Sequence, residues 1–368
     1  MTKFISIIAA AAMAITGCSS GQSAQADEPI KTIDERAEEI ISDMTLEEKV
    51  GQMFLVRYTD DEKAVSDIDE YKFGGYLLFA KDFQDKTKDD VIKSVSDCQS
   101  ASKVPLFIGV DEEGGIVNRV SKFPQFRNEP FKSPRELYNE GGYELISSDT
   151  QEKCELLKSL GINVNLAPVC DVSENPDSFI YERTLGQDAD ATSEYVSSVV
   201  EVMSKNNMGS ALKHFPGYGD NGDTHTDIIT DNRPIEEFKN SDFKPFAAGI
   251  SAGADMVLVS HNIVTAMDSA YPASLSPDVH KILREELNFD GIIITDDLSM
   301  QAITKYTDGS AAAVQAVKAG NDLLCCTDYE VQIPAVIEAV KNGDIAEETI
   351  NSSVKRIIKT KLKLGIME

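Results

Sequence analysis

The segment from Ala211 to His225, ALKHFPGYGDNGDTH, concentrates residue types that can do acid–base chemistry. Lys213 and His214 follow a short apolar run that is typical of a strand end. The next five residues contain one proline and two glycines, which do not continue a regular element. Asp223 and His225 then stand two residues apart, and a carboxylate beside an imidazole fixes its tautomer and tunes its pKa for general acid–base work. We therefore expect a catalytic loop over a pocket; the alternative is a buried His214 followed by a solvated turn.

Two further carboxylates follow a strongly apolar run, GIIITDDLSM. The run predicts a buried strand over Gly291–Thr295 that ends in Asp296 and Asp297. A paired acid at a strand end is often a helix N-cap, and Asp297 fits that interpretation. Asp296 comes one residue earlier and is better placed to attack an electrophilic carbon.

Other polar groups also stand just after predicted strands. Asp111 opens the segment DEEGG, in which two adjacent glycines let the backbone approach a ligand closely, and Arg119 lies beyond it. A carboxylate at such a place suits sugar hydroxyls, although a cation site or plain solvated acids are alternatives. Asp171 ends another strand, and Arg183 can give a ligand a forked pair of hydrogen bonds or neutralise nearby acids.

The elements that must position these groups are short apolar strands separated by amphipathic stretches. Eight apolar runs without alternation are typical of parallel strands that are covered on both faces. They are Phe54 to Tyr58, Gly75 to Phe79, Pro105 to Val110, Asn163 to Val169, Ser210 to Lys213, Asp255 to Ser260, Gly291 to Thr295 and Asp322 to Cys326. Helical periodicity predicts helices over residues 33–53, with a second start at a capping box at Thr45, over 195–203, 283–287 and 311–319, and a closing helix over 350–364.

Almost every one of these strands ends in a residue that can do chemistry. In a (β/α)8 barrel the carboxyl ends of all the strands converge on one mouth. In a doubly wound open sheet, the alternative, only those near the switch point would meet. We therefore predict a single TIM-type (β/α)8 domain over residues 32–368.

The first residues predict where the protein is located. Lys3 precedes a 12-residue apolar run from Phe4 to Ile15, which is too short to span a bilayer and is typical of a signal peptide. The following Thr16-Gly17-Cys18 looks like a bacterial lipobox; the alternative is an ordinary secretory signal with a chance cysteine. We predict a signal peptide over 1–17, a lipidated Cys18 with a flexible tether over 18–31, and a protein anchored to the cell membrane facing outward.

Composition excludes some classes of partner. The net charge of −27, without any Lys/Arg-rich run, argues against nucleic acid as a partner.

Five cysteines remain after Cys18, at positions 98, 154, 170, 325 and 326. They form no CxxC pair, so we expect buried thiols and no metal site. His280 lies in a helical stretch and is expected to be structural. We expect no cofactor and a monomer.

Taken together, the motifs resemble glycoside hydrolase family 3, and specifically its NagZ-type β-N-acetylglucosaminidases. The resemblance rests on KHFPGYG followed by DTH, on DEEGG, on NLAPVCDV with ERTLGQD, on GIIITDDLSM and on MTLEEKVGQM, in order from Asp34 to the C-terminus. KHFPG with DTH and TDDLSM is the specific part, whereas DEEGG alone is weak. Tyr218 departs from the pattern, since many relatives have histidine there, and the segment between Gly219 and Asp223 is short.

The resemblance implies a (β/α)8 fold, no metal, and a retaining exo-β-N-acetylglucosaminidase that removes terminal GlcNAc. Together with the predicted membrane anchor, it suggests peptidoglycan fragments as the substrate; free GlcNAc oligosaccharides and other β-hexosaminides are alternatives. It implies Asp296 as the nucleophile and His225 as the acid/base with Asp223 as its partner. The sugar-binding positions that it implies are Asp111, Arg119, Arg183, Lys213 and His214.

Four alternatives stay open at this point. Phosphorolysis is possible because an imidazole that can be neutral repels phosphate less than a carboxylate does. A β-glucosidase would have the same fold. A surface lipoprotein that binds sugar without turnover would not need Asp296, Asp223 and His225 together. A Schiff-base lyase would use Lys213.

Overall fold

The computed structural model describes residues 31–224, 226–326 and 328–367. The predicted signal peptide, lipidated Cys18 and most of the tether lie outside them. Within the described residues, eight parallel strands form one sheet in the order β10-β1-β2-β3-β4-β5-β7-β9. The strands are β1 (Phe54–Arg57), β2 (Gly75–Leu78), β3 (Phe107–Val110), β4 (Val164–Asn165), β5 (Gly209–Phe215), β7 (Met256–Val259), β9 (Ile292–Thr295) and β10 (Leu324–Cys326).

The two outer strands of this sheet meet. Ile294 of β9 bridges Leu323, the residue before β10, and the Thr295 backbone N–H donates to the Leu323 carbonyl at 3.1 Å. An open sheet would leave these two edges apart, so the predicted (β/α)8 barrel is confirmed and the doubly wound alternative is wrong. A separate parallel pair, β6 (Thr230–Asp231) with β8 (Ile263–Val264), lies outside the barrel sheet.

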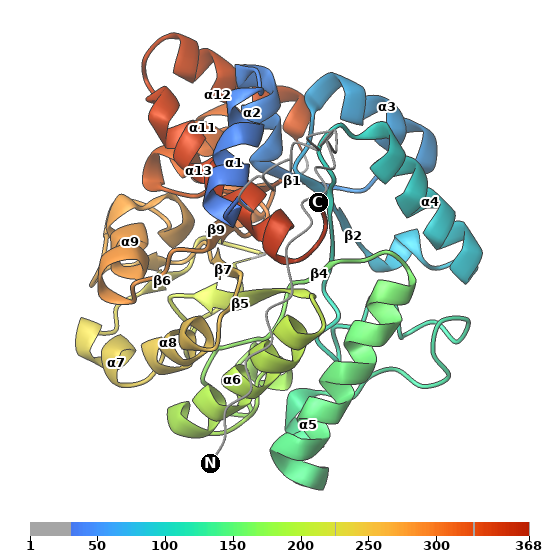
Figure 1. The fold of residues 1–368 in the computed structure, drawn as a ribbon. Coiled ribbons are helices and arrows are strands. Elements are labelled where there is room, and N and C mark those ends of the chain that lie inside the picture. The colour runs from blue at the N-terminus through green and yellow to red at the C-terminus, as the bar shows by residue number, and fades with distance from the viewer. Residues whose placement is uncertain (1–30, 225, 327, 368) are drawn as a thin grey trace, which may run out of the picture. The chain divides into compact units, whose positions relative to one another are not determined.

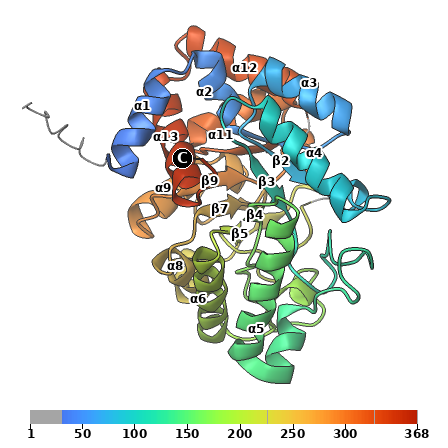
Figure 2. The same cartoon turned by 45° about the vertical axis from the view of Figure 1, so that its right-hand side comes forward.

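Helices surround the strands (Figure 1). The α-helices are α1 (Ile33–Ser42), α2 (Leu46–Gln52), α3 (Asp61–Tyr71), α4 (Lys88–Ala101), α5 (Pro134–Ser159), α6 (Ala189–Lys205), α7 (Ile235–Asn240), α8 (Phe243–Ser251), α9 (Pro277–Lys281), α10 (Gln301–Thr304), α11 (Gly309–Ala319), α12 (Tyr329–Lys341) and α13 (Glu347–Lys363). The first and last of them, α1 and α13, pack against each other (Figure 2). No helix in the described residues is both long enough and apolar enough to cross a bilayer.

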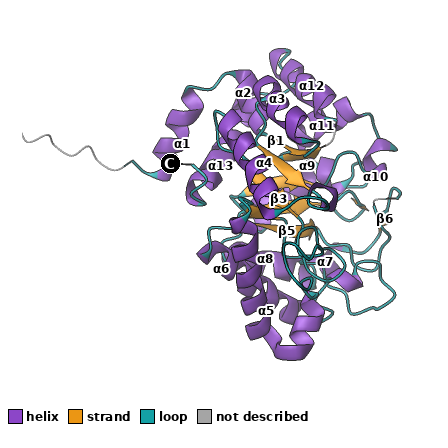
Figure 3. Ribbon diagram, turned by 90° about the vertical axis from the view of Figure 1, so that its right-hand side faces the viewer, coloured by secondary structure: helices purple, strands orange, loops and turns teal. Residues whose placement is uncertain are grey.

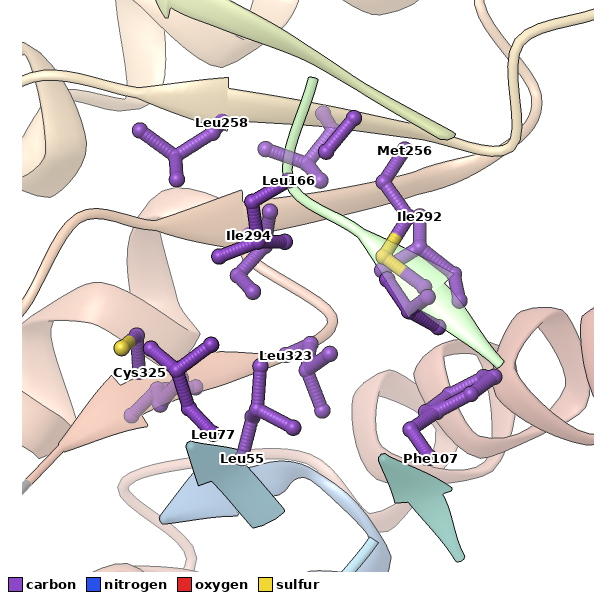
Figure 4. Close-up of a cluster of buried hydrophobic side chains, with 14 of the residues drawn as sticks. Leu55, Leu77, Phe107, Leu166, Met256, Leu258, Ile292, Ile294, Leu323 and Cys325 are labelled. Carbon is purple, nitrogen blue, oxygen red and sulfur yellow. The ribbon is translucent and has the colours of Figure 1, made fainter. Parts of the chain in front are cut away.

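Large apolar side chains fill the inside of the barrel. Figure 4 shows Leu55, Leu77, Phe107 and Ile294 converging there from four strands, together with Leu166, which directly follows β4, and all five are buried. Strands covered on both faces need no polar alternation, which explains why the sequence shows continuous apolar runs. The barrel is therefore a packed core and not a channel, and ligands can be received only at its ends.

The local predictions differ from the structure mainly at element ends. The capping box at Thr45 is confirmed, since Thr45 and Glu48 exchange hydrogen bonds at the start of α2. β4 has only two residues, and β5 runs on to Phe215, past the predicted end at Lys213. The expected helix over 283–287 is one π-helical turn, Ile282–Glu286.

Candidate active site

The carboxyl ends of the barrel strands open into a pocket of about 420 Å³. Loops gather at this end of the barrel, around β6 and α10 (Figure 3). Six of the residues singled out from the sequence line this one pocket, and they come from four different segments of the chain: the loop after β3, the loop after β4, strand β5 and the end of β9. They are Asp111, Arg119, Arg183, Lys213, His214 and Asp296. The convergence predicted from the strand ends is therefore confirmed.

A buried carboxylate, Glu113, lies between two cations of the pocket. Its Oε1 is 2.6 Å from Lys213 Nζ, and Arg183 donates to both of its oxygens, at 2.8 and 2.9 Å. Burial alone would raise the pKa of Glu113, but the charges of Arg183 and Lys213 outweigh burial and hold it well below its ordinary value. Lys213 also donates to Asp111 at 2.7 Å. Burial would lower the pKa of Lys213, but Asp111 and Glu113 raise it, so Lys213 is an ammonium ion.

His214 is held between an acid and a guanidinium. Its Nδ1 is 2.7 Å from Asp171 Oδ2, and its Nε2 is 3.0 Å from Arg183 Nη2. A guanidinium can only donate, so Nε2 must accept and the ring proton must lie on Nδ1, directed at Asp171. Both ring nitrogens of His214 are thus engaged by protein groups.

An irregularity in β5 brings Lys213 and His214 to the same pocket. Successive residues of a regular strand point to opposite faces. Here the register with β7 shifts between Leu212 and Phe215, and both side chains line the pocket. A bulge at the end of a barrel strand re-aims side chains in this way.

The turn that carries Glu113 also depends on an unusual backbone. Gly114 has φ +103°, and a Cβ there would come within 2.1 Å of the Lys132 carbonyl oxygen. Only glycine fits this position. The glycines of DEEGG therefore shape the turn that places Asp111 and Glu113.

Asp296 and Asp297 both line the pocket, where β9 ends. The Asp296 backbone N–H donates to the Val259 carbonyl at 2.9 Å, and Asp296 Oδ1 accepts from the Asp297 N–H at 2.9 Å. The N-cap interpretation of Asp297 is wrong. Its carboxylate accepts from the Ser299 N–H at 2.8 Å within a turn, and α10 begins later, with Met300 as its N-cap.

The loop after β5 folds back toward the segment that follows Asp296. His225 lies outside the described residues, but its neighbour Thr224 is fully buried. The Tyr218 hydroxyl and Thr224 Oγ1 are 2.7 Å apart, and the Ala302 N–H donates to the Thr224 carbonyl at 3.4 Å. Burial, followed by the charge of Asp296, raises the pKa of Tyr218 well above its ordinary value, so Tyr218 is a neutral phenol.

This geometry can be compared with known proteins. The model of the glycosyl hydrolase family 3 N-terminal domain matches residues 45–360. The chain belongs to glycosyl hydrolase family 3. A solved family 3 β-N-acetylglucosaminidase from Paenibacillus sp. str. FPU-7 superposes with a TM-score of 0.82 at 30% identity, covering 88% of this chain and 63% of that chain.

Two curated relatives of this family 3 chain are β-hexosaminidases. LpqI of Mycobacterium tuberculosis is 29% identical over 84% of this chain and 81% of its own length. β-Hexosaminidase A of Pseudoalteromonas piscicida is 28% identical over 81% of this chain. The family 3 chain covers only 54% of the length of that second relative.

Sequence reasoning missed two contributors to the family 3 pocket. The sequence favours Asp111 over Glu113 as a ligand-binding acid. In the structure, however, Glu113 is the centre of the charge network, because it is buried between Lys213 and Arg183. Phe79 was read only as a strand end, yet its ring lines the pocket under Arg57. One feature of the sequence does indicate Glu113. It directly precedes the glycine pair Gly114-Gly115, and a tight glycine turn after an acid is not needed when that acid simply faces solvent.

His280 and four of the cysteines are buried, as the sequence predicted. His280 is buried in α9 with Nδ1 2.8 Å from the Ser276 carbonyl oxygen, so its structural role is confirmed. Cys98, Cys154, Cys170 and Cys325 are buried free thiols. Across residues 31–224, 226–326 and 328–367, no group of three His, Cys, Asp or Glu side chains is arranged to hold a metal ion.

Proposed function

We propose that this family 3 protein is a retaining exo-β-N-acetylglucosaminidase that removes terminal GlcNAc from glycans. The supporting observation is that Asp296 shares one pocket with the network of Lys213, Glu113 and Arg183. Such a network presents fixed donors and acceptors for sugar hydroxyls, and the carboxylate of Asp296 supplies a nucleophile. The β-N-acetylglucosaminidase and β-hexosaminidase relatives support the choice of a 2-acetamido sugar.

In the proposed reaction, Asp296 attacks the anomeric carbon and the glycosidic C–O bond breaks. His225, assisted by Asp223, gives its proton to the departing oxygen. The product of this step is a glycosyl ester of Asp296. In the second step His225 takes a proton from water, which attacks the same carbon and releases the sugar and the free Asp296 carboxylate. Two inversions at one carbon give retention.

The contacts of His214 support this division of roles. Because both of its nitrogens are engaged, by Asp171 and Arg183, it is suited to hold the Arg183 guanidinium in place and not to shuttle a proton. The proton shuttle therefore falls to His225 on the loop. Lys213 and Arg183, both held by Glu113, orient the ring, and orientation of this kind lowers the barrier by making attack effectively unimolecular.

We also propose the setting of the reaction. The lipobox-like segment ending in Cys18 supports a lipid anchor on the outer face of the cell membrane, and cell-wall fragments are the glycans available there. Radiolabelled palmitate incorporated into the wild type but not into a Cys18→Ala variant would support the anchor. Unlabelled wild-type protein in the secreted fraction would contradict it.

The nucleophile can be tested by covalent trapping. A 5-fluoro N-acetyl-β-glucosaminyl fluoride slows hydrolysis of the ester, so mass spectrometry of the wild type should show one added sugar on the peptide that contains Asp296. Asp296→Asn should lose the adduct and at least about a thousandfold in kcat while keeping its circular dichroism spectrum. An adduct on Asp297, or an Asn variant with normal turnover, would refute the assignment.

Substrate class is tested by a panel of aryl glycosides that differ only at C2. We expect the 2-acetamido glycoside to be hydrolysed faster than the 2-hydroxy glycoside, whereas the reverse order would make the protein a β-glucosidase. The same assay with added inorganic phosphate separates hydrolysis from phosphorolysis, because only the latter releases the sugar 1-phosphate.

A further inference from the structure

His261 is a buried histidine, close to the pocket end of the barrel, that the proposed reaction does not use. It follows β7 by two residues, β7 pairs with β9 in the sheet, and the side chain has no exposed surface. Its place after a strand puts it at the same end of the barrel as Asp296. A polar ring is costly to bury unless its nitrogens are bonded, so the contacts of His261 indicate its role.

Both ring nitrogens of His261 bond to residues from other parts of the chain. Nε2 is 2.9 Å from the Asp297 carbonyl oxygen, and Nδ1 is 2.7 Å from Ser274 Oγ. A carbonyl oxygen can only accept, so Nε2 carries a hydrogen and donates it to Asp297. Ser274 is itself held, because its N–H donates to the Ser260 carbonyl at 2.9 Å and its carbonyl accepts from Asn321 at 2.7 Å. The ring is therefore fixed between a firmly placed hydroxyl and the turn that follows β9.

The turn that His261 holds also holds the proposed nucleophile. The Asp297 N–H donates to Asp296 Oδ1 at 2.9 Å. The N–H and the carbonyl of Asp297 flank one Cα, so fixing the carbonyl restricts the direction of the N–H. Because a carboxylate is a rigid planar group, the hydrogen bond to Oδ1 also sets where Oδ2 points. A continuous series of hydrogen bonds thus leads from Ser274 through His261 and the Asp297 backbone to the Asp296 carboxylate.

His280 shows how a purely structural histidine is bonded in this fold. It is also buried, but its Nδ1 contacts the carbonyl of Ser276, four residues earlier, at the start of its own helix. His261 instead reaches residues 13 and 36 positions along the chain, and the more distant one belongs to the turn of the nucleophile. Packing alone needs no contact between a ring and that turn.

We propose that His261 is a positioning residue: supported by Ser274, it holds the Asp297 carbonyl and thereby keeps the Asp296 carboxylate aligned for attack on the anomeric carbon. This inference rests on the proposed glycosidase function. Attack needs the two reacting atoms about 3–3.5 Å apart and correctly aligned, and a rotation of the carboxylate loses that alignment. His261 does not line the pocket, so its loss should slow the attack and leave sugar binding almost unchanged.

Two substitutions of His261 separate hydrogen bonding from packing. His261→Phe keeps a ring but removes the donor, and it should lower kcat on 4-nitrophenyl N-acetyl-β-glucosaminide by about tenfold to a hundredfold with little change in KM. His261→Gln keeps a side-chain N–H donor and should recover most of that loss. The rate at which the 5-fluoro glycosyl fluoride labels Asp296 should fall and recover in the same order, because labelling measures the attack directly.

Ser274→Ala tests the support of the ring and remains informative if the Phe variant does not fold. It should lower kcat by about fivefold without changing KM, and combining it with His261→Phe should add no further loss, because the hydroxyl acts only through the imidazole. His280→Phe is the matched control, since it replaces a second buried histidine that bonds a backbone carbonyl but does not line the pocket. It should lower the urea midpoint and leave kcat and the labelling rate unchanged.

Normal kcat and labelling rate in Ser274→Ala and in a folded His261 variant would overturn the proposal. So would a Gln variant no more active than the Phe variant, which would assign His261 to packing alone. A rise in KM as large as the fall in kcat would place His261 in sugar binding and also overturn it. A wild type that hydrolyses no glycoside refutes the proposed function, whereas an active wild type whose variants match His280→Phe refutes only the role of His261.

Discussion

At Glu113, one buried carboxylate accepts hydrogen bonds from Lys213 and Arg183 at once. Removing a single partner from a buried ion pair is far more destabilising than removing a surface pair, because the remaining charges stay desolvated. Here Lys213 would keep its contact with Asp111, whereas Arg183 would lose both of its hydrogen bonds to the Glu113 carboxylate. The same loss would release the side chains that orient the sugar.

Glu113→Gln should therefore lower the free energy of unfolding by about 3–5 kcal/mol and raise KM for aryl N-acetyl-β-glucosaminides more than it lowers kcat. Urea unfolding and steady-state kinetics measure both. Glu140→Gln, which breaks the half-exposed pair with Lys132, should cost about 1 kcal/mol or less. If Glu113→Gln were as stable as Glu140→Gln, the ion pairs of Glu113 with Lys213 and Arg183 would not be what stabilises the pocket.

The pKa of Glu113 also predicts an acid dependence. Its folded pKa lies well below the ordinary value of 4.5, so its contribution to stability is complete above pH 4.5 and is lost as the pH falls below that value. The difference in unfolding free energy between wild type and Glu113→Gln should shrink at low pH. A difference that stays constant from pH 6 to pH 3 would contradict this, and urea midpoints over that range measure it.

At the scale of elements, the loop after β5 is held by a small number of contacts. Tyr218 packs against the His214 ring with centroids 5.2 Å apart, its N–H donates to Asp171 at 2.8 Å, and its hydroxyl meets Thr224. Thr224 stands between the two residues of the proposed acid/base pair. Tyr218, the residue that departs from the family pattern, thus connects β5, which carries His214, to the loop that carries the proposed acid/base pair.

Tyr218→Phe and Thr224→Val should each lower kcat by up to about tenfold with little change in KM, because each removes the same hydrogen bond. The double variant should be no worse than either single one, which a double-mutant cycle on kcat measures. Thr224→Ser keeps the hydroxyl and serves as the control. Losses that multiply in the double variant would show that the two residues act independently.

At the scale of the whole barrel, the end opposite the pocket contains a buried lysine. Lys361 of α13 donates to Gln52 Oε1 at 2.7 Å and to the Gly74 carbonyl at 2.9 Å, near the start of β2. Burial lowers its pKa to about 7. Between pH 7 and the ordinary value of 10.5, the unfolded chain holds a proton that the folded chain lacks, so Lys361 makes the free energy of unfolding rise with pH across that window.

Replacing Lys361 by methionine should flatten this rise between pH 7 and pH 10. Lys361→Met also leaves Gln52 without its donor, so the slope and not the absolute stability is the informative quantity. Lys359→Met, on the same helix but one-third exposed, is the control and should keep the wild-type slope. Equal slopes in the two variants, measured by urea unfolding, would show that Lys361 stays charged in the folded protein.

The fold followed from features that are local in sequence. Continuous apolar runs such as Gly291–Thr295 identify strands covered on both faces, and polar residues at their ends indicate which end receives ligand. Periodicity also located most helices. Element ends were less predictable, as at β4 and β5, because a strand ends where its neighbours cease to pair with it.

By itself, the sequence determined the residue types of the candidate site and, through strand order, that Asp111, Lys213 and Asp296 would meet. Only the tertiary structure decided which charges neutralise one another: Glu113 became the shared partner of Lys213 and Arg183, while Lys213 also contacts Asp111. The physical reason is distance. Coulomb and hydrogen-bond energies depend on separations of a few ångströms between side chains on different strands, and spacing along the chain does not encode them.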